Sequence, residues 1–170
     1  INGKRVDVTI DDFLELAFVE ASTDGERFVR FPSVSLTPTD EQVGGFDGLD
    51  PTNIHNLAGK YRQGYGTPFD LEDIADSSGI DINNIRFVKL IDVVGCIQPE
   101  YASYDSQGNI INDPWPTPFY SSGFDLDAVC VINGGTPYSM SNFEDLSLDD
   151  NTYWNGSDES GSFSSGEITY

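Results

Sequence analysis

Residues 123–133 read GFDLDAVCVIN, an apolar run that Asp125 and Asp127 interrupt and that carries Cys130. A solvated segment would not need so many Val, Ile, Leu and Phe side chains, and a plain core strand would not carry two carboxylates. We therefore expect this segment to be the central strand of a calcium-assisted β-sandwich.

The composition favours β structure over helix. The chain has 170 residues, with 17 glycines, 8 tyrosines and 11 phenylalanines, and helix patterning built from Ala, Leu, Glu and Lys is nearly absent. A chain of this length can bury a substantial core. We expect a mainly β fold, an antiparallel, jelly-roll-like β-sandwich with long loops and one or two short helices.

The charge is strongly negative and unevenly spread. The formal net charge is −21; residues 1–89 hold all 8 Lys and Arg, and residues 90–170 hold 13 acids without a base. A phosphate backbone or an anionic membrane surface would be repelled, so nucleic-acid binding is not expected. No apolar run is long enough to cross a bilayer. The acidity serves solubility, and oxygen-rich loops also suit calcium.

Residues 13–33 predict a β-hairpin. Apolar residues alternate along its first arm, and Asp24 with Gly25 supplies the positive φ that a tight turn requires. One face of that arm carries Leu14, Leu16, Phe18 and Glu20, and the other carries Ala17, Val19 and Ala21.

Residues 85–97, IRFVKLIDVVGCI, predict a second strand that is apolar on both faces apart from Lys89 and Asp92 and is therefore central. Residues 36–84 are mostly irregular, with a short helix expected after Asp50 and another near residues 67–73. The composition changes after residue 133, which predicts a sandwich domain over residues 1–133 and a linker with the start of a second domain over residues 134–170.

Residues 13–133 contain four blocks in order, LAFVEASTDGERFVRFPS, GGFDGLDPTNIHNLAGKYRQGYGTPFDL, RFVKLIDVVG and NDPWPTPFYSSGFDLDAV. Together these blocks resemble a family of bacterial cell-surface proteins of unassigned activity. The resemblance implies an exported β-sandwich. Such proteins carry more strand sequence before the first block, so we expect the sandwich over residues 1–133 to lack N-terminal strands unless another segment completes it. Cys96 and Cys130 stand where the family has small non-cysteine residues.

Residues 142–170 are similar to the beginning of a second family of bacterial surface domains of unknown function. Those domains occur in exported proteins and outer-membrane lipoproteins, some encoded beside corrinoid-uptake genes. The resemblance implies that the chain derives from a longer multidomain surface protein, and Ile1 without an initiator Met or a signal pattern agrees with processing or a fragment.

Carboxylates are the main candidates for a binding site. Asp92 and Asp127 interrupt apolar strands, where a charge needs a cation, a basic partner or hydrogen-bond donors. Calcium is the preferred solution; the alternative is that the acids cap turns or pair with Arg86 or Lys89. The candidate calcium ligands are Asp105, Asn109, Asp113, Asp125 and Asp127.

Cys96 and Cys130 are the only cysteines, and without a Cys/His cluster zinc is not expected. If they lie on neighbouring strands, they form a cross-strand disulfide, which an oxidising compartment would preserve; the alternative is two buried thiols. Strand parity then places Asp92 on the face of the disulfide and Asp127 on the opposite face.

No catalytic constellation stands out. His55 is the only histidine, and nothing near it suggests a nucleophile or an orienting acid. With 29 acids, a pair suited to glycoside hydrolysis is expected by chance. Loop aromatics could stack on a sugar or a flat cofactor, although packing explains most such residues. These are Tyr61, Tyr65, Trp115, Phe119 and Tyr120.

The expected function is that of a non-enzymatic, calcium-stabilised, disulfide-bonded protein of the bacterial cell surface, acting in extracellular assembly or adhesion. Its expected partners are other copies of itself or another surface protein, joined by strand complementation. The alternative is an extracellular ligand-binding module for a glycan or a corrinoid.

Overall fold

The computed structural model describes residues 13–61, 65–118 and 122–132, and beyond them three short strands. The chain divides into two compact units, Ile1–Asp125 and Leu126–Tyr170. The described elements are almost all strands, in small antiparallel sheets, with two short 3-10 helices. The predicted mainly β class with one or two short helices is thus confirmed.

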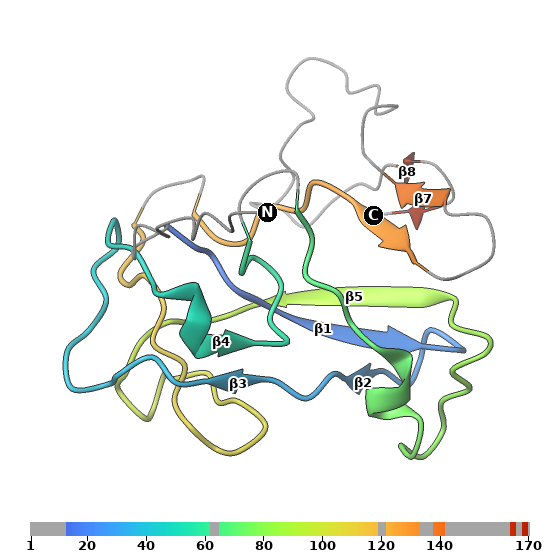
Figure 1. Ribbon diagram of the computed structural model, residues 1–170, viewed down its shortest axis with the longest axis horizontal. Coiled ribbons are helices and arrows are strands. Elements are labelled where there is room, and N and C mark those ends of the chain that lie inside the picture. The colour runs from blue at the N-terminus through green and yellow to red at the C-terminus, as the bar shows by residue number, and fades with distance from the viewer. Residues whose placement is uncertain are drawn as a thin grey trace, which may run out of the picture. The chain divides into compact units, whose positions relative to one another are not determined.

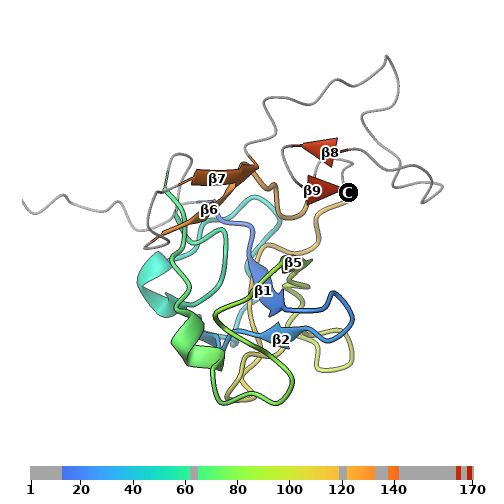
Figure 2. The same ribbon diagram turned by 90° about the vertical axis from the view of Figure 1, so that its right-hand side faces the viewer.

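The main sheet of the first unit has three strands in the order β2-β1-β5 (Figure 1). They are β1 (Ala17–Ser22), β2 (Val29–Arg30) and β5 (Phe87–Asp92). The β1–β5 ladder runs from Ala17 opposite Asp92 to Ser22 opposite Phe87. Figure 2 shows the same order from the side, with β1 in the middle.

The predicted hairpin is confirmed. β1 and β2 pair antiparallel, and Gly25 between them has a φ of 81°. The predicted alternation also holds, because the two faces of β1 enter two different apolar clusters. One cluster contains Leu14, Leu16 and Phe18, and the other contains Ala17, Val19 and Ala21.

Glu20 lies on the buried strand β1, between two bases. Its register partners are Arg30 on β2 and Lys89 on β5. Arg30 Nη2 lies 2.9 Å from Glu20 Oε1, and Lys89 Nζ lies 2.8 Å from Glu20 Oε2. Burial alone would raise the pKa of Glu20, but the hydrogen bonds and charges of Lys89 and Arg30 outweigh burial and lower this pKa. Lys89, which the sequence offered as a possible partner for an aspartate, therefore pairs with Glu20.

The rest of the first unit is a set of short elements around this sheet. β3 (Val34–Ser35) pairs with β4 (Ile54–His55), and η1 (Pro51–Asn53) leads directly into β4. η2 (Leu71–Ile74) buries Ile74 in the apolar cluster that contains Val19. Asp50 and Asp70 accept hydrogen bonds from the first turns of the two helices, as the predicted starts require.

The second unit contains two small sheets. β6 (Val129–Val131) pairs with β7 (Tyr138–Ser141), and β8 (Ser164–Ser165) pairs with β9 (Ile168–Thr169). The predicted domain boundary after residue 133 falls outside the described residues.

The two strands predicted to be central are not central among the described residues. Of the described residues within 123–133, only the three residues of β6 form a strand, and Cys130 in it is exposed. Of residues 85–97, the six residues of β5 form a strand, and Phe87 and Val88 in it are exposed. β1 is the strand with a neighbour on each side. A run of apolar residues therefore predicted strand structure here without predicting the place in a sheet.

Candidate functional site

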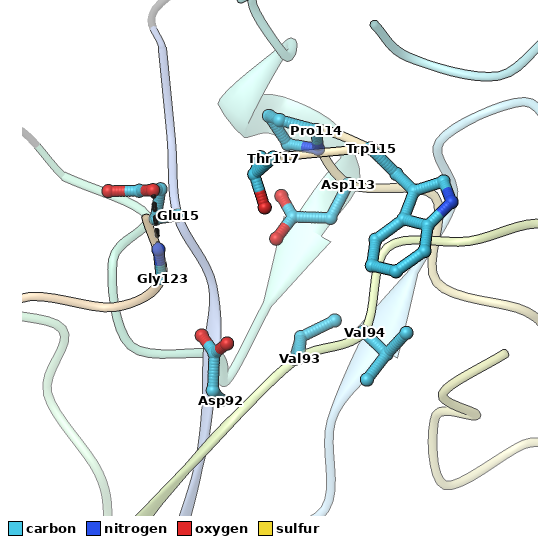
Figure 3. Close-up of a pocket in the computed structure, with 9 residues that line it drawn as sticks. All are labelled: Glu15, Asp92, Val93, Val94, Asp113, Pro114, Trp115, Thr117 and Gly123. Atoms are coloured by element: carbon cyan, nitrogen blue, oxygen red, sulfur yellow. Dashed lines mark hydrogen bonds between the residues drawn. The ribbon is translucent and has the colours of Figure 1, made fainter. Parts of the chain in front are cut away.

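A small pocket at one end of the main sheet is lined by three acidic residues (Figure 3). We call it the carboxylate pocket; Glu15, Asp92 and Asp113 line it, together with Trp115, Thr117, Gly123 and neighbouring apolar residues. Its volume is about 60 Å³, and no basic side chain is among its lining residues.

The β1–β5 ladder brings two of the carboxyl groups together. Asp92 is the last residue of β5 and lies opposite Ala17, so Glu15, two residues before Ala17, reaches the same end of the sheet. Asp113 lies in a loop and is hydrogen-bonded to the residues that flank β1 and β5. Its backbone N–H donates to Gly95 O after β5 (3.3 Å), and Leu16 N–H before β1 donates to its Oδ2 (3.2 Å). A Cβ at position 95 would overlap the Asp113 carbonyl, so this approach requires Gly95.

Asp113 is a buried acid with one unsatisfied oxygen. It is 4% exposed, and its Oδ1 has no hydrogen-bond partner. Burial raises the pKa of Asp113 to about 8; the Leu16 N–H opposes this rise, and the negative charges of Asp92 and Glu15 add to it. The carboxyl group is therefore mostly protonated at neutral pH unless a cation compensates its charge.

Glu15 and Asp92 each accept one hydrogen bond from the backbone of the segment at Gly123 and Phe124. Gly123 N–H donates to Glu15 Oε1 (2.9 Å), and Phe124 N–H donates to Asp92 Oδ1 (3.0 Å). Burial raises the pKa of Glu15. The hydrogen bond from Gly123 N–H opposes this rise, and the negative charges of Asp125 and Asp92 add to it. The Asp92 side chain in this otherwise apolar strand therefore has a donor, the backbone N–H of Phe124.

Asp105 and Asn109 lie together, but in a turn that they stabilise themselves. Asp105 Oδ1 accepts from the N–H groups of Gln107 and Asn109 (2.9 and 2.8 Å), and Oδ2 accepts from Ser35 N–H (3.0 Å) and Asn109 Nδ2 (2.9 Å). Burial would raise the pKa of Asp105, yet these donors outweigh it and lower the pKa. This arrangement matches the turn-capping alternative.

We expect Asp105→Ala to lower the free energy of unfolding by about 1–3 kcal/mol, because the buried Ser35 N–H loses its acceptor. Urea denaturation with and without a chelator measures this loss. It should be equal in both conditions, and the conservative Asp105→Asn variant should recover part of it. A loss that appears only when calcium is present would instead make Asp105 a calcium ligand.

The five predicted calcium ligands do not form one cluster. Within the described part of the chain, no three His, Cys, Asp or Glu side chains are grouped so as to hold a metal ion. Asp105 and Asn109 bond each other, Asp113 lies in the carboxylate pocket, and Asp125 and Asp127 are exposed. Calcium binding stays a prediction.

The predicted disulfide is not present. Cys96 is buried at 3% exposure, Cys130 is exposed, and the two are not bonded to each other. The prediction required the strands around them to be neighbours, whereas β5 pairs with β1 and β6 pairs with β7. A pairing of β5 with β6, on which the parity argument for Asp92 and Asp127 rested, is not among the described sheets.

The remaining candidates are dispersed. Tyr61 and Tyr65 are exposed, and Lys60 Nζ lies 5.4 Å from the Tyr61 ring centroid. Trp115 is 37% exposed and is the predicted aromatic that lines the pocket. Tyr120 and Phe119 fall outside the described residues. His55 is an exposed residue of β4, opposite Val34.

Sequence reasoning missed Glu15. The signal was available, because Glu15 is the polar member of the face that carries Ala17, Val19 and Ala21. The argument applied to Asp92, that an acid in an apolar strand needs a partner, would have selected it.

No family model, curated protein or solved structure matches the chain. The resemblances to surface-protein families therefore stay predictions. No helix in the described part of the chain is long and apolar enough to cross a membrane. The structure itself defines a β-rich protein of small antiparallel sheets with an acidic pocket at one end of the main sheet.

Proposed function

We propose that the chain is a non-enzymatic, calcium-stabilised domain of an exported surface protein, which assembles when the outer edge of β5 pairs with the same edge of a second copy. The observation that carries the proposal is that β5 is six residues long and that, among the described strands, only β1 pairs with it. A strand of this length with one neighbour presents a row of backbone donors and acceptors to a partner.

The direction of the backbone groups follows from the ladder. Val93 N–H donates to Leu16 O on the β1 side, at the position that continues the register of the two strands. Residues alternate along an antiparallel ladder, so Val88 and Leu90 direct their N–H and C=O groups away from β1. These two residues are the proposed donors and acceptors of the assembly.

Among the described residues, the usual protection of an edge strand is missing here. Natural edge strands are often guarded by lysine, but the lysine of β5, Lys89, binds Glu20 and lies 4.1 Å from the Phe28 ring centroid. Phe87 and Val88 are exposed at 40% and 36%. An exposed apolar strand of this kind favours association over solvation.

Two further points support the proposal. Identical edges can pair across a twofold axis, and calcium can offset the repulsion expected between copies with a net charge of −21. The two apolar clusters on opposite faces of β1 are what a layered sandwich would contain. Export and surface location rest on the family resemblance.

We expect Val88→Pro to abolish self-association, because proline removes an outward N–H without removing a β1–β5 hydrogen bond. The matched control is Val88→Thr, which keeps the N–H and the β-branched shape. Sedimentation velocity of both variants and the wild type, with calcium and with a chelator, measures the effect; circular dichroism confirms that each is folded.

A wild type that stays monomeric with calcium throughout the micromolar range would overturn the proposal, as would equal association of the two variants. The carboxylate pocket does not support the alternative of a glycan or corrinoid module, because its volume of about 60 Å³ is far smaller than sites for ligands of that size. Cobalamin and glycan titrations test that alternative directly.

A further inference from the structure

One peptide bond in the lining of the carboxylate pocket joins an acid to a proline. Asp113 and Pro114 both line the pocket (Figure 3), and Asp113 is buried. An aspartate side chain can attack its own carbonyl carbon, because the two groups belong to one residue and the ring that closes is five-membered. Proline makes this attack productive, since its nitrogen is more basic than other amide nitrogens and accepts the proton that it needs to leave.

The Asp113 carboxyl group is arranged for this attack. Leu16 N–H donates to Oδ2 (3.2 Å), whereas Oδ1 is buried and has no hydrogen-bond partner among the described residues. Oδ1 is therefore a nucleophile that neither water nor a donor weakens. The carboxyl group also keeps a proton at neutral pH, because burial raises its pKa to about 8, and this proton can pass to the leaving nitrogen.

The carbonyl group of Asp113 accepts a hydrogen bond from a side-chain amide. Gln42 Nε2 donates to Asp113 O (3.2 Å), and a donor of this kind stabilises the negative charge that grows on the oxygen during attack. Gln42 is itself held in place, since its Oε1 accepts from Ile97 N–H (3.0 Å). The pocket of about 60 Å³ has room for the water that completes a hydrolysis, because a water needs roughly 10–15 Å³ of such space.

A second Asp–Pro bond of the chain, Asp50–Pro51, offers an internal comparison. Thr52 Oγ1 and Thr52 N–H both donate to Asp50 Oδ1 (2.7 and 2.9 Å), and these hydrogen bonds lower the pKa of Asp50. The Asp50 carbonyl also accepts a hydrogen bond, from Asn53 N–H (3.1 Å), so the two Asp–Pro bonds differ chiefly in the aspartate side chain. The ionised Asp50 has no proton to give to the nitrogen of Pro51.

We propose that the folded chain cleaves itself at the Asp113–Pro114 bond, with the Asp113 side chain as the nucleophile. Asp113 Oδ1 bonds to the Asp113 carbonyl carbon, the carboxyl proton passes to the nitrogen of Pro114, and the bond between that carbon and that nitrogen breaks. This step leaves a cyclic anhydride on Asp113 and a free amino group on Pro114. Water then opens the anhydride to the side-chain carboxyl group and a new C-terminal carboxyl group. The reaction occurs once within one chain, so it does not depend on assembly through β5.

The two fragments stay hydrogen-bonded to each other in the folded protein. On the second fragment, Trp115 N–H donates to Val43 O (3.0 Å) and Gly123 N–H donates to Glu15 Oε1 (2.9 Å), and both acceptors lie on the first fragment. The cut is therefore measured under denaturing conditions.

Denaturing mass spectrometry of purified protein, incubated at neutral pH with protease inhibitors, tests the proposal. The folded wild type should accumulate residues 1–113 and 114–170 with first-order kinetics. This cleavage should be at least about tenfold faster than cleavage at Asp50–Pro51 in the same sample, because only Asp113 combines a nucleophile with a proton. In urea the two bonds should break at the same slow rate, since the arrangement around Asp113 is lost.

Asp113→Asn should abolish the two fragments, because the amide is a poor nucleophile and carries no acidic proton. Asp50→Asn, the same change at the other Asp–Pro bond, is the matched control and should leave them unchanged. Pro114→Ala keeps the aspartate but has a less basic leaving nitrogen, so it should slow the cleavage about tenfold or more even if Asp113→Asn is poorly folded. Absence of the fragments from the folded wild type, equal rates at the two Asp–Pro bonds, or an unchanged rate in Pro114→Ala would each overturn the proposal.

Discussion

In the presence of a chelator, we expect the free energy of unfolding of the wild type to fall as the pH rises from about 5 to about 8, and Asp113→Asn to remove most of that fall. The folded-state pKa of Asp113 is about 8, above its ordinary value of 3.8. The folded protein therefore keeps a proton that the unfolded chain has released, and stability declines with pH between the two values.

The sign is opposite for the acids whose pKa is lowered by folding. Glu20 and Asp105 add stability as the pH rises through the acid range, below the window in which Asp113 acts. Above pH 5 the buried Asp113 should dominate, by an amount on the order of a few kcal/mol at pH 8. Asn has the same shape, carries no charge and can still accept from Leu16 N–H.

Urea denaturation of wild type and Asp113→Asn at several pH values between 5 and 8 measures this difference. The variant should be the more stable protein at pH 8, and the gap should close as the pH falls. Parallel curves for the two proteins would show that Asp113 ionises normally. Asp40→Asn, which makes the same charge change at an exposed position, is the matched control, and its curve should follow that of the wild type.

We expect Asn112→Ala to lower the free energy of unfolding by about 3–5 kcal/mol. Asn112 is fully buried, at 0% exposure, and every hydrogen bond of its side chain is used. Its Nδ2 donates to Pro38 O and Glu41 O (2.7 Å each), and its Oδ1 accepts from Val43 N–H and Gln42 Nε2 (3.0 Å each).

Alanine would leave these loop groups without partners in a space that water does not freely enter, which is why the cost exceeds that of one hydrogen bond. Thermal and urea unfolding measure it. Asn83→Ala, at an exposed turn position, should change stability by no more than about 0.5 kcal/mol. A loss of less than about 1 kcal/mol for Asn112→Ala would mean that the loop carrying Val43 is held by other contacts.

The same substitution should disturb the carboxylate pocket. Asn112 precedes Asp113, and Gln42, which bonds Asn112, also donates to Gly95 O and Asp113 O (2.9 and 3.2 Å). The backbone of Asp113 is thus held by the network that Asn112 completes. The pH dependence of stability that comes from Asp113 should therefore weaken in Asn112→Ala.

Local features were predictable because their causes lie within a few residues. Alternation in residues 13–33 placed Leu16 and Val19 on opposite faces of β1, and Gly25 marked the turn. The caps of η1 and η2 were equally local, since an aspartate accepts from an N–H two residues ahead.

The candidate site was predictable only in part. Asp113 was selected as a possible ligand and Asp92 as an acid in need of a partner, but Glu15 was missed, and Asp105 proved to hold a turn. An acidic residue shows in the sequence that something must compensate its charge. It does not show whether a cation, a base or a backbone donor will do so.

The sequence by itself determined that this chain forms strands, where the first hairpin turns, and that its acids must be compensated. Only the tertiary structure decided that, among the described strands, β1 rather than β6 has a neighbour on each side, that Cys96 and Cys130 do not bond, and that Asp113, Asp92 and Glu15 line one pocket. The physical reason is that apolar strands of similar composition can pair in several orders with similar burial. The order is decided by long-range contacts, such as the register that sets Asp92 opposite Ala17 and the hydrogen bond from Leu16 to Asp113.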